Sequence, residues 1–236
     1  MKILGIIPAR GGSKGIKDKN LIPLAGKPLI AWTIKCARDA GIFHRIIVST
    51  DSKKISDVAQ SYDADVPFLR PAELATDKAG AIEVLIHSLK WLEEHGNETY
   101  DVVYYLQPTS PLRQPVDIRN SLDLMIGKKA EAVVSVCETE HHPLWAGPLP
   151  PDGNMAAFFS SDLHKKNRQE LPPYYRLNGA IYCSKVESFL TRKDWYGDKT
   201  YACIMPQERS ADIDNLFDIA LTEFLISKGK LDPWNK

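Results

Sequence analysis

Glycines and lysines follow the first apolar run of the chain, in the stretch PARGGSKGIKDKN at residues 8–20. Residues 10–27 carry a surplus of four positive charges in a chain that has no net charge. Gly11, Gly12 and Gly15 let the backbone turn tightly and bring N–H groups close to an anion. Because ligands of open α/β sheets bind beyond the carboxyl ends of the strands, this loop is predicted to bind phosphate. The alternative is a flexible, solvated basic loop.

The loop departs from two common nucleotide-binding patterns. A Walker A loop has Lys-Ser or Lys-Thr after its spaced glycine, whereas Lys14 is followed by Gly15 here. The sequence also lacks a G-x-G-x-x-G dinucleotide pattern at this position. The glycines and cations therefore indicate phosphate chemistry of another kind.

Asp212 and Asp214 lie two residues apart near the end of the sequence. Along an extended strand such residues point to the same face, where their carboxylates repel each other unless a cation lies between them. Carboxylates with retained waters are typical ligands of Mg²⁺, so the spacing predicts a magnesium site. The alternative is that the aspartates cap a helix expected from Leu216, although Asn215 can supply that cap.

The composition argues against several classes of protein. Thirty Lys and Arg balance thirty Asp and Glu among 236 residues, which disfavours a broadly basic nucleic-acid binder and a polybasic membrane anchor. Hydrophobic residues make up 44% and charged residues 25%, as in globular rather than disordered chains. No apolar run approaches the length of a membrane span, so we expect no membrane partner and no nucleic-acid partner.

The start of the sequence and its cysteines favour a cytoplasmic protein. The apolar part of MKILGIIPAR is too short for a typical signal peptide, and we expect it to be a buried strand. The four cysteines form no C-x-x-C pair and are far apart, which fits a reducing compartment.

Short apolar runs alternate with helical patterns along most of the chain. Continuous or β-branched apolar runs predict strands, and apolar residues three and four positions apart predict amphipathic helices. Their alternation predicts an α/β fold with a mostly parallel sheet. Strands are expected at 3–7, 45–50, 102–106, 132–137, 180–183 and 201–205, a short extended piece at 65–69, and helices at 29–40, 52–61, 79–92, 115–126 and 216–226.

The pattern changes after about Glu138. Residues 141–173 are rich in Pro, Gly, Asn and charge and show little periodicity. A stretch of this length without regular structure is typical of partner contact or of substrate cover. We therefore divide the chain into a core, 1–139 and 201–236, and an insert, 140–200.

Several segments together resemble one enzyme family. IPARGGSKGIKDKNLIPLAGKPLI is followed in order by VSTDS at 48–52, RPAELATDKA at 70–79, LQPTSPLR at 106–113, EHHPL at 140–144, LNGAIY at 177–182 and DID at 212–214. These segments cover nearly the whole chain, and in this order they resemble the acylneuraminate cytidylyltransferases, which activate nonulosonic acids. The resemblance implies that CTP and a free sialic, legionaminic or pseudaminic acid give a CMP-sugar and pyrophosphate.

The resemblance also implies a fold, a metal and an assembly. The fold is a three-layer α/β/α nucleotidyltransferase, Rossmann-like, in which the insert makes a homodimer. The metal is Mg²⁺, held by Asp212 and Asp214. Phosphoryl transfer gains most from positioning and fixed positive charge, which suits the cations of the first loop.

Individual residues acquire roles through the same resemblance. Catalytic roles fall to Arg10, Lys14, Lys19, Asp212 and Asp214. Nucleotide binding is implied for Ala9, Arg10, Gly11, Ser13, Asn20, Arg70 and Ala79. Arg70 has an alternative, a surface pair with Asp65 or Glu73.

Sugar binding is implied for Gln107, Ser110, Arg168, Asn178, Tyr182, Trp195 and Tyr196. Arg168 would pair with the sugar carboxylate, and a bidentate pair of this kind selects an acid. Trp195 and Tyr196 match aromatic residues that one subunit lends to the site of the other. Asn178 could instead belong to a turn with Gly179.

Two positions depart from the family pattern, and three other functions stay open. Trp145 stands where many sialic-acid members have lysine, and Gly80 stands where serine is common. These changes concern the identity of the sugar more than the reaction. The alternatives are a CMP-Kdo synthetase, a metal-dependent glycosyltransferase with DID as its D-x-D motif, and a non-catalytic nucleotide sensor.

Overall fold

The computed structural model describes residues 1–13, 15–76, 79–159, 167–229 and 234. Its body is a six-stranded sheet in the order β4-β1-β5-β7-β6-β8. β7 is antiparallel to both neighbours, and the other neighbouring pairs are parallel. This confirms the expected mostly parallel sheet. The strands are β1 (Ile3–Pro8), β4 (Arg45–Ser49), β5 (Val102–Tyr105), β6 (Ala132–Glu138), β7 (Tyr175–Lys185) and β8 (Thr200–Ile204).

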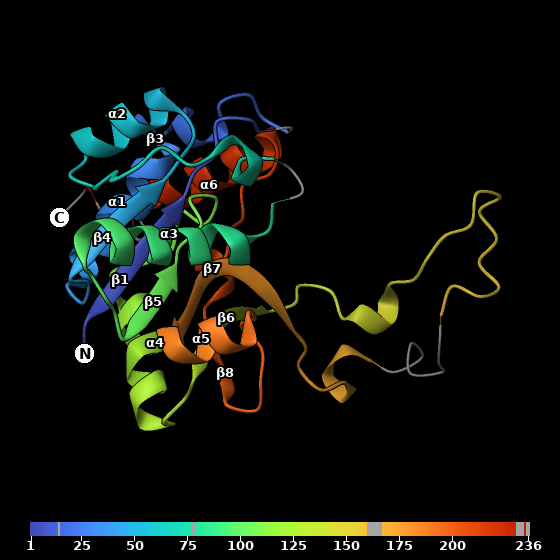
Figure 1. Cartoon of the computed structure of the whole chain (residues 1–236). Helices are drawn as coiled ribbons and strands as arrows, with labels where there is room; N and C mark the ends of the chain where they lie inside the picture. Colours follow the sequence, from blue (N-terminus) through green and yellow to red (C-terminus); the bar gives the residue numbers. More distant parts are fainter. Residues whose placement is uncertain (14, 77–78, 160–166, 230–233, 235–236) are drawn as a thin grey trace.

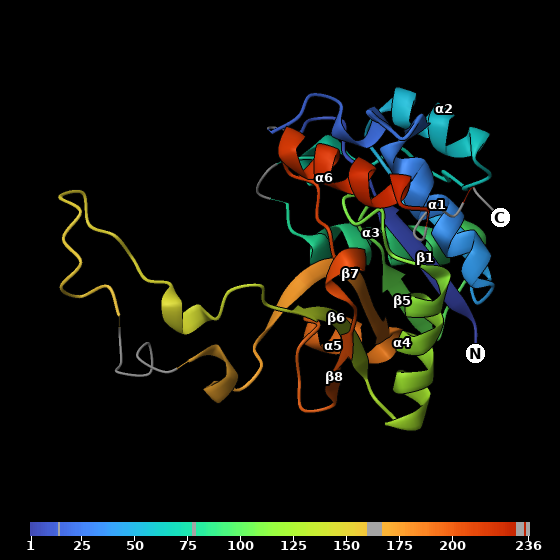
Figure 2. The same cartoon turned by 180° about the vertical axis from the view of Figure 1, so that it is seen from behind.

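Helices cover both faces of the sheet, as Figures 1 and 2 show from opposite sides. One face packs against α1 (Leu29–Ala40), α2 (Lys53–Ser61) and α4 (Pro115–Gly127). The other packs against α3 (Ala81–Gly96) and α5 (Val186–Arg192). The predicted three-layer α/β/α fold is therefore confirmed. A smaller cluster joins α1 to α6 (Leu216–Ser227) and to the hairpin of β2 (Pro23–Leu24) and β3 (Lys27–Pro28).

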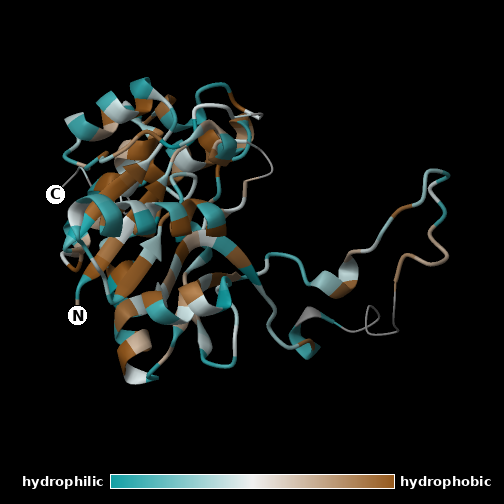
Figure 3. Cartoon of the chain, in the orientation of Figure 1, coloured by the Kyte–Doolittle hydropathy of each residue, from teal (hydrophilic) through white to brown (hydrophobic). Residues whose placement is uncertain are grey.

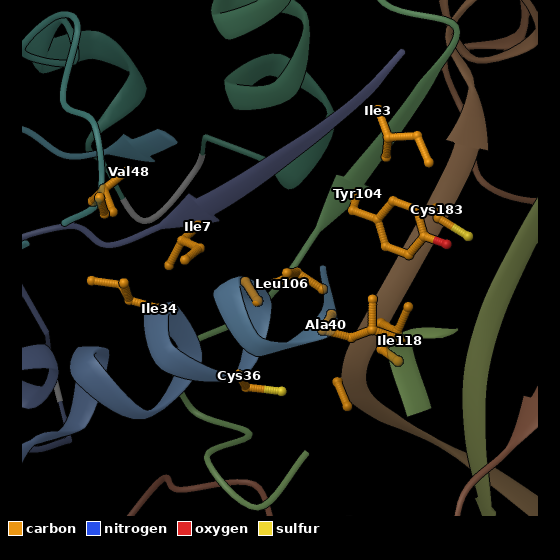
Figure 4. Packing of buried hydrophobic residues seen from close by; sticks show 14 of the residues in the cluster. Ile3, Ile7, Ile34, Cys36, Ala40, Val48, Tyr104, Leu106, Ile118 and Cys183 are labelled. Atoms are coloured by element: carbon orange, nitrogen blue, oxygen red, sulfur yellow. The ribbon is translucent and has the colours of Figure 1, made fainter. Parts of the chain in front are cut away.

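The central strands are apolar on both faces because helices cover both. Along β1, Ile3 and Ile7 belong to one core cluster, and Leu4 and Ile6 belong to the cluster on the opposite face. Figure 4 shows Ile3 and Ile7 in the cluster that also contains Ile34 of α1. In Figure 3 the central strands are mostly brown (hydrophobic), and the helices that cover them carry both brown and teal residues. Because both faces of the sheet are buried, a ligand can reach it only at the ends of the strands.

Side-chain caps set the start of three helices. Ser52 accepts a hydrogen bond from the Ile55 N–H at the start of α2. Gln114 and Asp117 form a capping box at α4, and Asn215 and Asp218 form another at α6. Asn215 thus supplies the cap of α6, which leaves Asp212 and Asp214 available for another role.

A long arm leaves the sheet between β6 and β7. It runs from Thr139 to Tyr174, and its base is closed by a hydrogen bond from the Thr139 N–H to the Tyr174 carbonyl. In Figure 1 the described part of the arm extends away from the body (yellow to orange). The insert boundaries 140–200 stay a prediction, but that range includes β7, which lies in the middle of the sheet.

The structure differs from the expected elements in a few places. β7 begins at Tyr175 rather than at residue 180, and α3 continues to Gly96 rather than ending at residue 92. The short helix α5 follows β7 without a break and was not expected. The extended piece at 65–69 makes only two isolated bridges to the region of β4. Among the described residues, no helix has both the length and the apolar character needed to cross a membrane.

Candidate active site

A cavity of about 470 Å³, the first cavity, lies beyond the carboxyl ends of β1 and β5. Its position agrees with the rule that open α/β sheets bind ligands at this edge. Its walls come from the N-terminal loop, the segment before α3 and the start of that helix, the turn after β5 and the segment before α6. The lining residues include Arg10, Ser13, Gly15, Lys19, Asn20, Arg70, Ala79, Gly80, Tyr105, Gln107, Thr109 and Asp214.

Hydrogen bonds hold the N-terminal loop in shape. Ala9 is buried, and its N–H donates to the Ser49 carbonyl at 3.0 Å. The Gly11 N–H donates to Asp51 Oδ1 at 2.8 Å. Asn20 is also buried and donates from Nδ2 to the Arg10 carbonyl at 3.0 Å. These bonds fix both ends of the loop at the wall of the cavity, while Gly12, Gly15 and Lys17 between them are exposed.

The N-terminal loop meets the C-terminal region at Asp214, whereas Asp212 is not among the described residues that line the first cavity. Lys19 Nζ donates to Asp214 Oδ1 and to the Ile213 carbonyl, both at 2.9 Å. A Cβ on Gly15 would lie 2.8 Å from the Asp214 carbonyl oxygen, so this approach requires glycine. Folding thus brings Lys19 and Asp214, which carry opposite charges and lie 195 positions apart in the sequence, to one cavity.

Asp212 and Asp214 flank the buried residue Ile213. The segment is not a strand, although the Ile213 N–H donates to the Thr109 carbonyl at 2.8 Å. Asp214 has 73% of its side chain exposed, whereas Asp212 is half-buried. Burial raises the pKa of Asp212, and the nearby charge of Asp214 acts in the same direction, against Thr109, Lys19 and Arg176.

The pair fits a divalent cation. Asp212 Oδ1 is buried and accepts no hydrogen bond from the protein. An orphaned buried carboxylate oxygen is unfavourable, and a hard cation such as Mg²⁺ would satisfy it. Within the described ranges no group of three or more His, Cys, Asp or Glu could hold an ion. Waters and phosphate oxygens would therefore complete the coordination, as is usual for Mg²⁺.

Arg70 forms a buried part of the wall. It donates to Ser49 Oγ at 3.1 Å and to the carbonyls of Ser49 and Leu74. Burial lowers the pKa of its guanidinium. The alternative of a surface pair with Asp65 or Glu73 is wrong, because Arg70 is buried and Asp65 pairs with Arg45. Ala79 lies in the same wall.

A second cavity of about 450 Å³ adjoins the first. The two share Gly80, Ala81, Tyr105 and Gln107. The second cavity is further lined by Ile82, Glu83, Tyr182, Asp194, Trp195 and Tyr196. Gln107, Tyr182, Trp195 and Tyr196, four of the residues expected to bind sugar, thus come together here.

Aromatic packing builds the second cavity. Trp195 is only 5% exposed, and its ring centroid lies 5.4 Å from that of Tyr182 and 6.2 Å from that of Tyr105. Burial raises the pKa of the Tyr182 hydroxyl. The resemblance implied that Trp195 and Tyr196 are lent to a partner, but here both line a cavity of their own chain.

Ser110 and Asn178 lie behind the cavities. Asn178 is 1% exposed, and its amide bonds to Ser135 Oγ at 2.6 Å and to Ser210 Oγ at 2.9 Å. The buried Ser110 hydroxyl donates to the Asn178 carbonyl at 3.3 Å. Both side chains are bonded to the protein, which suits positioning of the neighbouring Gln107 better than direct contact with a ligand.

For two of the expected site residues, the position of the side chain is not described. Lys14 lies outside the described residues. Arg168 is described only as the start of a 3-10 turn in the arm. Their roles stay predictions.

The sequence and the fold of the chain both match known proteins. The family model described as "Cytidylyltransferase" matches residues 4–228, nearly the whole chain. The chain belongs to the cytidylyltransferase family.

Two relatives show different extents of similarity within this family. The CMP-N,N'-diacetyllegionaminic acid synthase of Legionella pneumophila is 39% identical over 96% of this chain and 97% of its own length. The N-acylneuraminate cytidylyltransferase of Escherichia coli O18:K1:H7 is also 39% identical over 93% of this chain. The match spans only 51% of that protein, about half its length.

Two further comparisons extend to more distant proteins. The pseudaminic acid cytidylyltransferase of Campylobacter jejuni is 31% identical over 95% of this chain and 96% of its own length. A solved structure of CMP:2-keto-3-deoxy-manno-octonic acid synthetase complexed with CTP superposes with a TM-score of 0.71. It covers 97% of this chain and 100% of that chain at 15% identity, which shows a shared fold.

Three residues of this cytidylyltransferase escaped the sequence analysis. Asp51 accepts the hydrogen bond from the Gly11 N–H. Its position in VSTDS, directly after the β4 segment, was the only sign of this role in the sequence. The buried Arg113 donates from Nη1 to the Gln107 and Ala180 carbonyls and from Nη2 to Thr33 Oγ1. Glu83 lines the second cavity, and no sequence pattern marked it.

Proposed function

We propose that this cytidylyltransferase joins the CMP part of CTP to a nonulosonic acid and releases pyrophosphate. The observation that carries the proposal is the pair of adjoining cavities, one lined by cations and an aspartate and the other by aromatic rings. The named relatives support this choice of substrate, since they act on sialic, legionaminic and pseudaminic acids.

The first cavity would hold the nucleotide. Its size and its fixed positive charges suit a triphosphate, to which Arg10 would donate as a planar fork. Lys19 would neutralise charge that develops at the α-phosphate during transfer. Ala9, Gly11, Ser13 and Asn20 would shape the phosphate loop, and Arg70 and Ala79 would border the ribose and the base.

Asp212 and Asp214 would hold a divalent cation, Mg²⁺, which when bound polarises phosphate oxygens and neutralises their charge. Lys19 bonds to Asp214 and therefore keeps the cationic loop and the acidic pair in register.

The second cavity would hold the sugar. Its anomeric hydroxyl would attack the α-phosphate, forming one P–O bond as the bond to the pyrophosphate breaks. Gln107 lies in the wall shared by both cavities, where it can bond to the sugar close to the reacting atoms. Tyr182, Trp195 and Tyr196 offer flat apolar surface to acyl groups.

The assembly and the location belong to the same proposal. A homodimer is supported by the arm, which carries exposed apolar side chains including Leu149, Met155 and Phe159. An arm with this surface would contact a second copy, and Arg168 could then face a substrate carboxylate. A cytoplasmic location is supported by four free, buried cysteines, which suit a reducing compartment.

Pyrophosphate release tests the reaction and the choice of sugar together. The purified chain with CTP and Mg²⁺ is given N-acetylneuraminic, legionaminic, pseudaminic or eight-carbon Kdo acid in turn. We expect turnover with at least one nine-carbon acid and little with Kdo. Turnover of Kdo alone would support the alternative synthetase. CTP binding without any pyrophosphate release would support a nucleotide sensor.

A further inference from the structure

The start of α3 has an unusual close approach between Gly80 and Glu83. A Cβ on Gly80 would lie 2.5 Å from Glu83 Oε2, closer than two such atoms can come. The Glu83 carboxylate therefore occupies the space that a side chain at position 80 would need. Because this carboxylate is the end of a flexible side chain, a larger residue at position 80 would move it without disturbing the helix.

This arrangement places a carboxylate in the second cavity. Gly80 and Glu83 both line that cavity, together with Asp194. Asp194 Oδ1 is held by the N–H groups of Trp195 at 2.7 Å and Tyr196 at 3.3 Å. The described residues that line the second cavity include two acids and no lysine or arginine.

The first cavity has the opposite balance. Arg10, Lys19 and Arg70 line it, and Asp214, its acid, is paired with Lys19. An acidic sugar that spans the shared wall thus experiences attraction on one side and repulsion on the other. Its carboxylate is disfavoured in the second cavity, while the uncharged end of its carbon chain is accepted there.

An ionised carboxylate only accepts hydrogen bonds, so its partner in the cavity must donate. Acylamino N–H groups and hydroxyl groups donate, and an acyl methyl beside them can pack on Trp195 and Tyr182. We infer that Glu83 is a specificity-determining residue, which accepts a hydrogen bond from the acylamino-bearing end of the sugar, remote from its carboxylate. The inference rests on the proposed function and deepens it, because it selects acids that carry an acylamino group at that end.

Three variants and one control test the inference. Glu83→Ala removes the acceptor, and Glu83→Gln keeps its shape without the charge. Gly80→Ser displaces the Glu83 carboxylate and offers the start of α3 a better cap. Glu94→Ala removes an exposed acid near the other end of the same helix and serves as the control.

The readouts are the KM of CTP, the KM of the best acidic sugar and Tm. Because a hydrogen bond to a charged group contributes appreciably, Glu83→Ala should raise the sugar KM about tenfold. Glu83→Gln and Gly80→Ser should raise it less. In the two Glu83 variants the CTP KM should stay within twofold of the wild type, and the Tm should stay within about two degrees of it.

The acylamino preference gives a second readout. With a sugar that carries neither an acylamino N–H nor a hydroxyl at that place of the remote end, Glu83→Ala should change the KM less than twofold. An unchanged sugar KM, or an equal rise in the KM of both substrates, would overturn the role of Glu83 and leave the proposed function standing. A wild-type chain that releases no pyrophosphate with any acidic sugar would overturn the proposed function and this inference with it.

Discussion

The two adjoining cavities are built in different ways. The first owes its shape to polar bonds between distant parts of the chain, such as those from Gly11 to Asp51 and from Lys19 to Asp214. The second owes its shape to rings that belong to the apolar core, among them Trp195. A change in the first should therefore alter charge and chemistry with little effect on folding. A change in the second should alter sugar binding and stability together.

The largest effect is expected at Asp212. Asp212→Asn should lower kcat at least a thousandfold in the presence of Mg²⁺, because the contribution of a bound metal to charge neutralisation amounts to several kcal/mol. Without metal the same variant should have a Tm equal to or above the wild type, since it removes a half-buried charge with an orphaned oxygen. Steady-state kinetics and thermal unfolding measure the two effects.

The control for this variant is Asp123→Asn, which changes an exposed acid on α4. It should leave both kcat and Tm near the wild type. Retained activity in Asp212→Asn would refute the metal site. A lower Tm without metal would show that folding depends on Asp212. This would contradict the expectation that changes around the first cavity have little effect on folding.

The region around the first cavity was predictable from sequence in its local elements but not in its long-range contacts. The expected helix 29–40 has the bounds of α1, because its apolar spacing and Gly41 are local signals. The position of the loop could be predicted because its glycines and lysines follow a strand. The position of the two aspartates could be predicted because they precede the helix cap Asn215. These features depend on neighbours in the sequence, whereas the bond from Lys19 to Asp214, 195 residues away, could not be read without a structure.

The region around the second cavity likewise depends on contacts between residues that are distant in sequence. The amide of Asn178 is bonded to Ser135 and Ser210, which lie 43 and 32 residues away. β7 begins at Tyr175 because β6 pairs with it, although Leu177 is 50% exposed and the strand start lacks an apolar pattern. The resemblance named Trp195 and Tyr196 and implied that they serve a partner's site, but it did not show that they line a cavity of their own chain.

The next largest effect is expected at Trp195. Trp195→Leu should raise the sugar KM about tenfold and leave the CTP KM within twofold, because an aromatic surface is lost only from the second cavity. It should also lower the free energy of unfolding by about 2 kcal/mol, as large-to-small changes in a core do. Titration of each substrate and denaturant unfolding measure the effects.

Phe189→Leu is the matched control for Trp195→Leu. Phe189 is fully buried, its ring centroid lies 4.8 Å from that of Trp195, and it is absent from the lining of the second cavity. It should lower stability by a similar amount and leave the sugar KM unchanged. Equal rises in the sugar KM for both variants would mean that general loosening, rather than ring contact, determines sugar binding.

A smaller effect is expected at Asp51. Asp51→Ala leaves the Gly11 N–H without its acceptor, so the loop loses one fixed point and the CTP KM should rise about fivefold. Asp51→Asn should restore most of the affinity, because its amide oxygen can still accept that bond. Asp57→Ala, which removes an exposed acid of α2, should leave the CTP KM unchanged. A rise in the sugar KM alone would contradict the assignment of the loop to the nucleotide.

The smallest effect is expected at His87, whose ring packs against Phe68. Burial lowers the pKa of His87, and the charge of Arg70 acts in the same direction against Glu73 and Glu94. The unfolded chain therefore binds a proton at His87 more readily than the folded chain, so stability should fall as pH drops below about 6.5. His87→Leu should reduce the difference in Tm between pH 7.5 and pH 5.5, whereas His95→Leu, at the exposed end of α3, should not. An unchanged difference in His87→Leu would mean that the cationic wall of the first cavity tolerates a second positive charge beside Arg70.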